Sequence, residues 1–298
     1  MSMSKAILVV LAALDIVLPV RAQVFKLTRE RMIQYTASNP FDRFGDGRPK
    51  VPDSILERVK EMSMEEVWGV EGMGFPSQYA GGWKIVNPEK KVVGRAVTLL
   101  LMPLRPEVAV VDSTGIPSHG SEGKITHQTA LDLLQKGDVI VVDARAIDGG
   151  VIGDNLATYI NDMGAAFVID GMIRDLDGIK EIGMTGYYRE AVPPPLTDCM
   201  VAGINIPVTI GKVTVMPGDV VLGDTEGVYF IPPKVVKQLV DEADETHIHD
   251  EWTKKKFGEL KYKSTDIYGH PHDPALVKEY QEYLKQHLDA LHKQREQQ

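Results

Sequence analysis

The chain is poor in cysteine and has no excess of basic residues. Its one cysteine, Cys199, excludes an intramolecular disulfide and any cysteine-rich zinc site. Lysine and arginine together number 33 against 42 aspartates and glutamates, so the formal net charge is −9. Because proteins bind phosphate backbones through basic surfaces, this balance argues against nucleic acid as a partner.

Internal repeats and long hydrophobic runs are also missing, with one exception at the N-terminus. Residues 6–20 are largely apolar, but the run is shorter than a membrane-spanning helix requires. Lys5 precedes this run, and Val20-Arg21-Ala22 ends it like a cleavage site before Gln23, so residues 1–22 are typical of a signal peptide. We therefore expect a periplasmic or secreted protein with no stable membrane association after cleavage. The alternative is an ordinary buried helix, because Asp15 interrupts the apolar run.

Composition divides the rest of the chain into three parts. Residues 23–80 are predicted to be a polar, helical extension, residues 81–232 an α/β core, and residues 233–298 a charged helical extension. Individual patterns predict a helix start at Ser63 with Glu66 three residues later, helices at 125–135, 235–256 and 273–298, and strands at 187–192 and across 204–233.

The most informative stretch runs from residue 136 to 177 and predicts a βαβ unit. Its parts are a strand at Val139–Val142, a glycine-rich loop at Gly149–Gly153, a helix at Leu156–Met163 capped by Asp154 and Asn155, a strand at Ala165–Ile169, and a turn carrying Arg174 and Asp175. Ligands of such units bind beyond the carboxyl ends of the strands. Backbone N–H groups, a guanidinium and carboxylates are therefore expected together, a set that suits a small carboxylate substrate and a hard divalent metal.

Each of these residues also has a simpler interpretation. An isolated Arg-Asp pair is usually a solvated surface turn, and Asp154 could serve only as a helix cap. The position of Arg174 and Asp175 at a strand end, opposite a glycine loop, favours a site instead.

Several segments of the core resemble one known family. They are Gly137-Asp138 with Val139–Asp143, Gly153-Asp154-Asn155-Leu156-Ala157, Val168–Gly171 with Arg174-Asp175, Val213–Asp219, and Gly223–Val228. Over residues 81–232 the sequence resembles the RraA-like family, which contains regulators of ribonuclease E and class II 4-hydroxy-4-methyl-2-oxoglutarate aldolases. The resemblance implies an α/β protein with a swivelling β/β/α domain, here with helical N- and C-terminal extensions. It also implies a homotrimer or homohexamer with sites between subunits.

The resemblance implies roles for particular residues. In the aldolases of this family, a divalent metal, Mg²⁺ or Mn²⁺, assists catalysis, which here implies Asp175 as metal ligand and Arg174 as substrate-binding residue. Asp154 matches the acid that holds a water on the metal. Backbone N–H groups beside it, at Asn155 and Leu156 next to Gly153, would hold the substrate. A carboxylate from the C-terminal helix of a neighbouring subunit would complete the site, and Glu251 or Asp250 match it.

We therefore expect a metal-dependent carbon–carbon lyase. Its reaction would be retro-aldol cleavage or decarboxylation of a 2-oxo diacid, such as 4-hydroxy-4-methyl-2-oxoglutarate or oxaloacetate, with release of pyruvate. Two alternatives remain: a non-catalytic regulator of the same fold, and a lyase or dehydratase of sugar-derived acids. The second stays open because Gly178 stands where the family usually has an acidic residue, and because of the long extensions.

Overall fold

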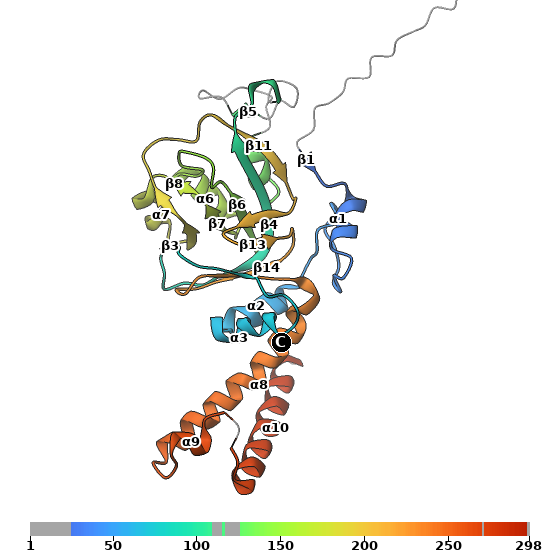
Figure 1. Cartoon of the computed structure of the whole chain (residues 1–298), viewed down its shortest axis with the longest axis vertical. Coiled ribbons are helices and arrows are strands. Elements are labelled where there is room, and N and C mark those ends of the chain that lie inside the picture. Colours follow the sequence, from blue (N-terminus) through green and yellow to red (C-terminus); the bar gives the residue numbers. More distant parts are fainter. Residues whose placement is uncertain (1–24, 109–114, 117–125, 270, 297–298) are drawn as a thin grey trace, which may run out of the picture.

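The computed structural model describes residues 25–108, 115–116, 126–269 and 271–296. Figure 1 shows a body of sheet and helices, from which one long helix leaves and a second returns. We call this helical pair the arm. The predicted signal peptide, residues 1–22, lies outside the described residues.

Helices predominate at both ends of the described chain, and helices alternate with strands only between α5 and β9. The helices are α1 Arg29–Tyr35, α2 Asp53–Glu61, α3 Met64–Trp68, a 3₁₀ helix η1 Gly69–Glu71, α5 Gln128–Leu131, α6 Asp154–Asp162, α7 Leu176–Ile182, α8 Pro233–Gly258, α9 Ser264–Ile267 and α10 Pro274–Glu296. The strands are β1 Phe25–Lys26, β2 Tyr79–Ala80, β3 Lys84–Val86, β4 Val92–Pro103, β5 Gly115–Ile116, β6 Asp138–Asp143, β7 Ala166–Asp170, β8 Met172–Ile173, β9 Gly186–Tyr188, β10 Glu190–Ala191, β11 Cys199–Ile204, β12 Val208–Ile210, β13 Val213–Val215, β14 Val220–Gly223 and β15 Val228–Ile231.

The main sheet has a parallel centre that sets up the site. Its strand order is β2-β15-β14-β4-β6-β7-β9-β3, with β11 paired to β4. Strands β4, β6 and β7 run parallel, and Asp143 and Asp170, the last residues of β6 and β7, are neighbours, with Leu100 of β4 beside Asp143. Helix α6 connects β6 to β7, so the predicted βαβ unit is confirmed. The loops that follow β6 and β7 therefore emerge at the same edge of the sheet.

Alternating side chains divide the core into layers. On β6, Ile140 and Val142 pack with helices α5 to α7, whereas Val139 and Val141 face the opposite side. That opposite side is covered by the β12–β13 hairpin. Helices α2, α3 and the start of α8 cover the outer face of β14 and β15. Both faces of the central strands are buried, as their continuous apolar runs predict.

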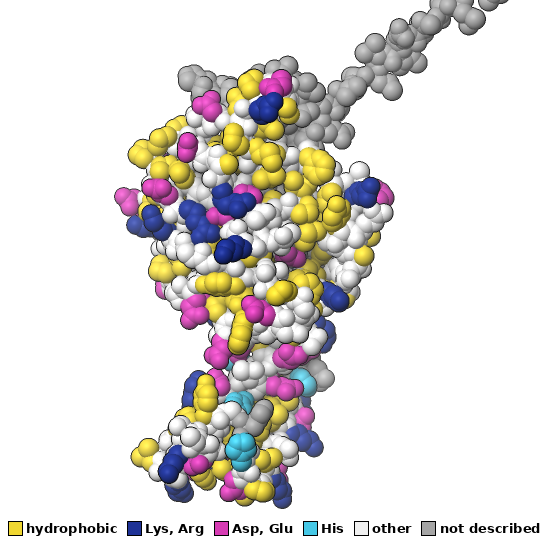
Figure 2. Space-filling view, viewed as in Figure 1, with side chains coloured by type: hydrophobic (Ala, Val, Ile, Leu, Met, Phe, Trp, Pro, Cys, Tyr) yellow, Lys and Arg dark blue, Asp and Glu magenta, His cyan; other side chains and the backbone are white. Residues whose placement is uncertain are grey.

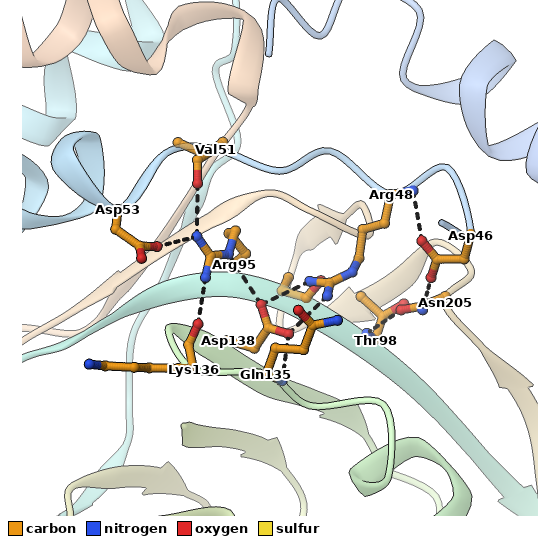
Figure 3. A network of polar contacts seen from close by, with 11 residues as sticks. Asp46, Arg48, Val51, Asp53, Arg95, Thr98, Gln135, Lys136, Asp138 and Asn205 are labelled. Atoms are coloured by element: carbon orange, nitrogen blue, oxygen red, sulfur yellow. Dashed lines mark hydrogen bonds and ion pairs between the residues drawn. The ribbon is translucent and has the colours of Figure 1, made fainter. Parts of the chain in front are cut away.

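A buried ion cluster ties the N-terminal extension to the sheet (Figure 3). The Arg48 guanidinium donates two hydrogen bonds to the Asp138 carboxylate, of 3.1 and 2.8 Å. Arg95 donates a third bond of 3.2 Å to the same carboxylate and also binds Asp53. Arg48 is 2% exposed, and its guanidinium stacks 4.2 Å from the centre of the Phe44 ring. The extension is thus held by a desolvated, multiply bonded arginine.

The arm has a small core of its own. Trp252 on α8 is fully buried and packs with Ile267 and Leu276. The histidines visible in Figure 2 lie on the arm, where acidic and basic side chains are interspersed. Among the described residues, no helix is long and apolar enough to cross a membrane.

The helical predictions are mostly confirmed. Ser63 and Glu66 form the predicted capping box at the start of α3. Helix α8 spans the predicted segment 235–256. The prediction of a helix at 125–135 was wrong in length, because α5 ends at Leu131 and tight turns then lead into β6.

The strand and loop predictions needed more correction. The single strand predicted at 187–192 is two strands in different sheets, β9 and β10. Strand β11 had no predicted counterpart over most of its length. Helix α6 begins at Asp154, not at Leu156, and Gly153 is its N-cap. Asp154 is therefore the first helical residue and not the cap.

Candidate active site

The glycine loop after β6 is held by backbone hydrogen bonds to two other segments. Gly150 N–H donates to the Pro194 carbonyl, and Val151 N–H donates to the Met172 carbonyl. Arg174 N–H donates in turn to the Ile152 carbonyl at 2.9 Å. Gly149 has a φ of +97°, and a Cβ there would lie 2.3 Å from the Pro195 carbonyl oxygen. This contact requires glycine, and the loop is thereby fixed against the residue that carries the guanidinium.

Arg174 and Asp175 fold over Gly153 at the start of α6. A Cβ on Gly153 would lie 2.3 Å from Asp175 Oδ2 and 3.1 Å from Arg174 Nε. Arg174 Nε and Asp175 Oδ2 are 3.4 Å apart, and the two side chains are 38% and 39% exposed. Both charged groups are thus held at the positive end of a helix while remaining accessible.

Asp175 has an unusual backbone conformation. Its φ is +55°, in the left-handed region, and its side chain makes no capping bond to α7, which starts at the next residue. A non-glycine residue in this region costs free energy, and such residues cluster at functional sites. The strained backbone and the accessible carboxylate, which does not cap α7, point to a role outside the local fold.

Asp154 lies against the first turn of α7. A Cβ on Gly178 would lie 2.9 Å from Asp154 Cβ and 3.1 Å from its Oδ2. Gly178 therefore leaves room for Asp154, and an acidic side chain at 178 would displace it. Asp177 points away, with 98% of its side chain exposed. Asp154 therefore joins Asp175 as a second acid where the starts of α6 and α7 meet.

The two backbone N–H groups expected to bind substrate, at Asn155 and Leu156, differ in their present contacts. Asn155 N–H donates to Asp154 Oδ1 at 2.8 Å, so a ligand would have to replace that bond. Leu156 lies on the same turn of α6 and lines the cavity beside it. The first turn of α6 thus presents its amide groups close to Arg174.

A cavity of about 150 Å³ adjoins these residues. Its lining residues are His127, Gly150, Val151, Gly153, Asn155, Leu156, Arg174, Pro195 and Leu196. One water molecule takes about 30 Å³ of the liquid, so the cavity has room for a small organic acid. Burial lowers the pKa of the His127 imidazole to about 4, and the ring is therefore neutral at physiological pH.

Two predicted site residues lie far from this cavity in the single chain. Glu251 is on the arm, where it lines a different hollow with His247 and Arg295. Asp250 is on the same helix, and its carboxylate lies 3.7 Å from His249. Their predicted approach to the site of a neighbouring subunit remains a prediction.

A larger cavity and a second charged cluster lie elsewhere. The cavity, of about 410 Å³, is formed between residues 34–39 and the core, and buried Asp219 is in its wall. In the cluster, Asp143 pairs with Arg145 and Asp170 with Arg189. We place the site at the smaller cavity because the Asp175 carboxylate beside it is 39% exposed, whereas the Asp143 and Asp170 carboxylates are 10% and 3% exposed and paired with arginines.

The residues around Asp175 fit a hard metal ion. Among the described residues, no three or more histidine, cysteine or acidic side chains gather as a closed metal cage would need. Mg²⁺ does not require such a cage, because it keeps several waters and takes one or two carboxylates. The accessible Asp175 carboxylate, with Asp154 nearby, matches that requirement.

Two features of the site escaped the sequence analysis. Helix α7 has apolar residues at Leu176, Ile179 and Ile182 and ends at Gly183 with a φ of +77°, a short helical pattern that was detectable. No local pattern marks His127, because it reaches the cavity only through the tertiary fold.

Comparison with known proteins supports the family and the fold. The sequence model of the RraA-like family (Aldolase/RraA) matches residues 67–230, more than half of the chain. The chain belongs to the RraA-like family. A member from Halalkalibacterium halodurans, named "Putative 4-hydroxy-4-methyl-2-oxoglutarate aldolase", is 28% identical over 157 residues, which are 52% of this chain and 75% of that protein.

Other RraA-like relatives support the fold. A protein of the same name from Ectopseudomonas mendocina is 36% identical over 105 residues, covering 34% of this chain and 64% of that relative. The crystal structure of Streptomyces coelicolor RraAS2, described as an unusual member of the RNase ES inhibitor RraA family, aligns with a TM-score of 0.58 and 24% identity, covering 74% of this chain and all of that one. This structural likeness shows the shared fold alone.

Proposed function

We propose that this RraA-like protein is a divalent-metal-dependent carbon–carbon lyase. It would cleave or decarboxylate a 2-oxo diacid, such as 4-hydroxy-4-methyl-2-oxoglutarate or oxaloacetate, and release pyruvate. The observation that carries this proposal is the convergence of Arg174, Asp175 and Asp154 at the adjoining starts of α6 and α7. The names of the relatives from H. halodurans and E. mendocina point to the same class of reaction.

Each residue has a role that follows from its chemistry. Arg174 offers a planar fork that binds the carboxylate or oxo group of the substrate with two hydrogen bonds. The first amides of α6, at Asn155 and Leu156, add favourable dipoles for the same anion. Asp154 lies close enough to exchange a proton with a water molecule at this junction.

Asp175 would hold the metal ion. When bound, a divalent cation supplies Lewis-acid stabilisation of the negative charge that develops as the carbon–carbon bond breaks. Aldol cleavage and β-decarboxylation of 2-oxo acids both develop that charge, so one site serves both reactions. Arg174 pairs with the Asp175 carboxylate at 3.4 Å and helps to orient it.

Pyruvate release from a panel of oxo diacids tests the proposal. We expect purified protein to release pyruvate with Mg²⁺ or Mn²⁺ and to lose that activity with a chelator. Asp175→Asn should abolish the metal-dependent rate while circular dichroism stays unchanged. Full activity of this variant at saturating metal would remove Asp175 from the mechanism, and no pyruvate from any acid would refute the lyase.

In the same assay, Arg174→Lys tests whether the planar, bidentate guanidinium is needed or whether a positive charge is enough. We expect kcat/KM to fall at least about tenfold, because an ammonium cannot reproduce the bidentate contact. Arg145→Lys is the matched control, since Arg145 belongs to the separate Asp143 cluster. Unchanged kinetics for Arg174→Lys would make Arg174 a surface charge only.

A further inference from the structure

His127 is a polar residue of the cavity that the roles above leave unused. It precedes the short helix α5, an element that supplies no other lining residue. Much of the surrounding wall is apolar, with Val151, Leu156 and Leu196 among its members. The imidazole therefore brings hydrogen-bonding capacity to a part of the cavity that otherwise has little.

The ring is not held by a structural hydrogen bond at its inner nitrogen. His127 Nδ1 is buried and has no hydrogen-bond partner among the described residues. Buried polar atoms are nearly always paired, and an unpaired one calls for an explanation such as a catalytic or ligand-binding role. An apolar side chain would fill the same space without leaving a polar atom unpaired.

The ring also differs in charge from its polar neighbour. Arg174 is cationic, whereas burial keeps the pKa of His127 at about 4 and the imidazole neutral. A neutral imidazole can accept a hydrogen bond at one nitrogen and donate one at the other. It therefore suits a hydroxyl or a carboxylate equally, while Arg174 suits an anion only.

We propose that His127 contacts the substrate and selects acids with a second polar end beyond the oxo-carboxylate that Arg174 binds. This inference rests on the proposed function, because it assumes that the cavity holds a 2-oxo acid. In the bound state one ring nitrogen would pair with the hydroxyl or distal carboxylate of the substrate. A monoacid such as pyruvate has no group for that contact and would bind independently of His127.

Binding of two unreactive probes separates these possibilities. Isothermal titration calorimetry with Mg²⁺ present would compare pyruvate with 2-oxoglutarate, which has a distal carboxylate. We expect His127→Phe to weaken 2-oxoglutarate at least about fivefold, as loss of one hydrogen bond predicts, and to leave pyruvate unchanged. His127→Asn, whose amide lies near the position of Nδ1, should restore most of the affinity.

A matched control and the opposite outcomes make the test decisive. His292→Phe changes an exposed histidine on α10 and should affect neither probe. If His127→Phe leaves both affinities unchanged, or weakens both equally, the imidazole only fills space and the inference fails. A wild-type protein that binds neither acid would instead contradict the proposed function itself.

The kinetic counterpart follows from the same contact. With a hydroxy-oxo diacid as substrate, His127→Phe should raise KM about as much as it weakens 2-oxoglutarate, with His127→Asn close to wild type. A loss confined to kcat, without a change in KM, would contradict a role in substrate selection.

Discussion

At the scale of single residues, the site depends on close approach as much as on charge. Gly153 lets the Asp175 carboxylate and the Arg174 guanidinium lie against the first turn of α6. Gly178 on α7 likewise leaves room for the side chain of Asp154 on α6. Because glycine has no side chain, each of these positions leaves space that a charged side chain occupies. With glycine at 178, Asp154 occupies the space that a side chain at 178 would take.

Gly153→Ala should displace the Asp175 carboxylate, the proposed metal ligand, without unfolding the protein. The added Cβ would fall 2.3 Å from Asp175 Oδ2, the movable end of a side chain. The backbone of Gly153, with φ of −118°, accepts alanine without strain. We expect metal affinity to fall by about tenfold, as for other changes beside a ligand. Unfolding free energy should fall by about 1 kcal/mol at most, because alanine is a poorer N-cap.

Metal titration and urea unfolding measure these two quantities separately. Gly258→Ala is the control, since a Cβ at Gly258 meets nothing within 4 Å. Wild-type metal affinity in Gly153→Ala would show that the Asp175 carboxylate does not need its observed position.

Asp219 makes the stability depend on pH. Burial raises the pKa of its carboxyl to about 7, while the unfolded chain has the ordinary value near 4. Between these values the folded state binds more protons, so stability is greatest below the lower pKa and declines as pH rises to about 7. The loss reaches at most about 4 kcal/mol above that pH.

Asp219→Asn should remove this dependence. The amide oxygen can still accept the 2.8 Å hydrogen bond from Met216 N–H, and asparagine does not ionise. Thermal melting from pH 4 to pH 8 should show a variant that is progressively more stable than wild type as pH rises. A constant difference over that range would mean that Asp219 is ionised throughout.

At the scale of elements, the site rests on two helix starts and one anchored extension. Helices α6 and α7 follow β6 and β7 of the parallel centre, which places their positive ends at one edge. At the opposite end of β6, Arg48 links the N-terminal extension to Asp138, the first residue of that strand. The N-terminal extension therefore contacts the start of β6, the strand whose far end leads into the site.

Arg48→Met should release this anchor. Asp138 would keep Arg95 and the Gln135 N–H but lose two charge-assisted bonds in a buried place. Breaking a buried pair from one side costs about 3 kcal/mol or more. Urea unfolding should show that loss, and the segment 36–52 should become more sensitive to protease. Lys50→Met, an exposed change in the same segment, should have little effect.

The double variant Arg48→Met, Asp138→Asn tests whether the loss comes from the pair. If it does, the double variant should be more stable than the sum of the single losses predicts, by about 1–3 kcal/mol. Simple additivity would assign the loss to packing of Arg48 on Phe44 instead.

At the scale of the whole molecule, the arm and the site are separate in one chain. Helices α8 and α10 project away from the body (Figure 1), and Glu251 lies on the arm. The cavity at Arg174 is small and partly open, whereas reactions that develop negative charge benefit from enclosure. Because the family resemblance implies sites shared between subunits, we expect a trimer or hexamer in which Glu251 or Asp250 approaches the Arg174–Asp175 site of another copy.

Mixed assembly tests the shared site. Arg174→Ala and Glu251→Gln proteins, each expected to be inactive alone, would be unfolded, mixed and refolded. Activity should return, because some sites would then combine an intact Arg174 with an intact Glu251. A fully active monomer in light scattering would rule the arrangement out.

The sequence by itself determined the elements whose signals are local. The apolar run of β6, the capping box at Ser63 and Glu66, and the long helix α8 all follow from periodicity and capping. The order strand, glycine loop, helix, strand also placed Arg174 and Asp175 at a strand end. These features depend on neighbours only a few residues apart, which the sequence displays directly.

Only the tertiary structure decided the contacts between distant segments. Arg48 meets Asp138 across 90 positions of sequence, and His127 reaches a cavity built by residues 150–196. The role of Gly178 emerges only when α7 packs beside Asp154 on α6. Such contacts depend on strand order and helix packing, which bring together side chains that no local periodicity relates.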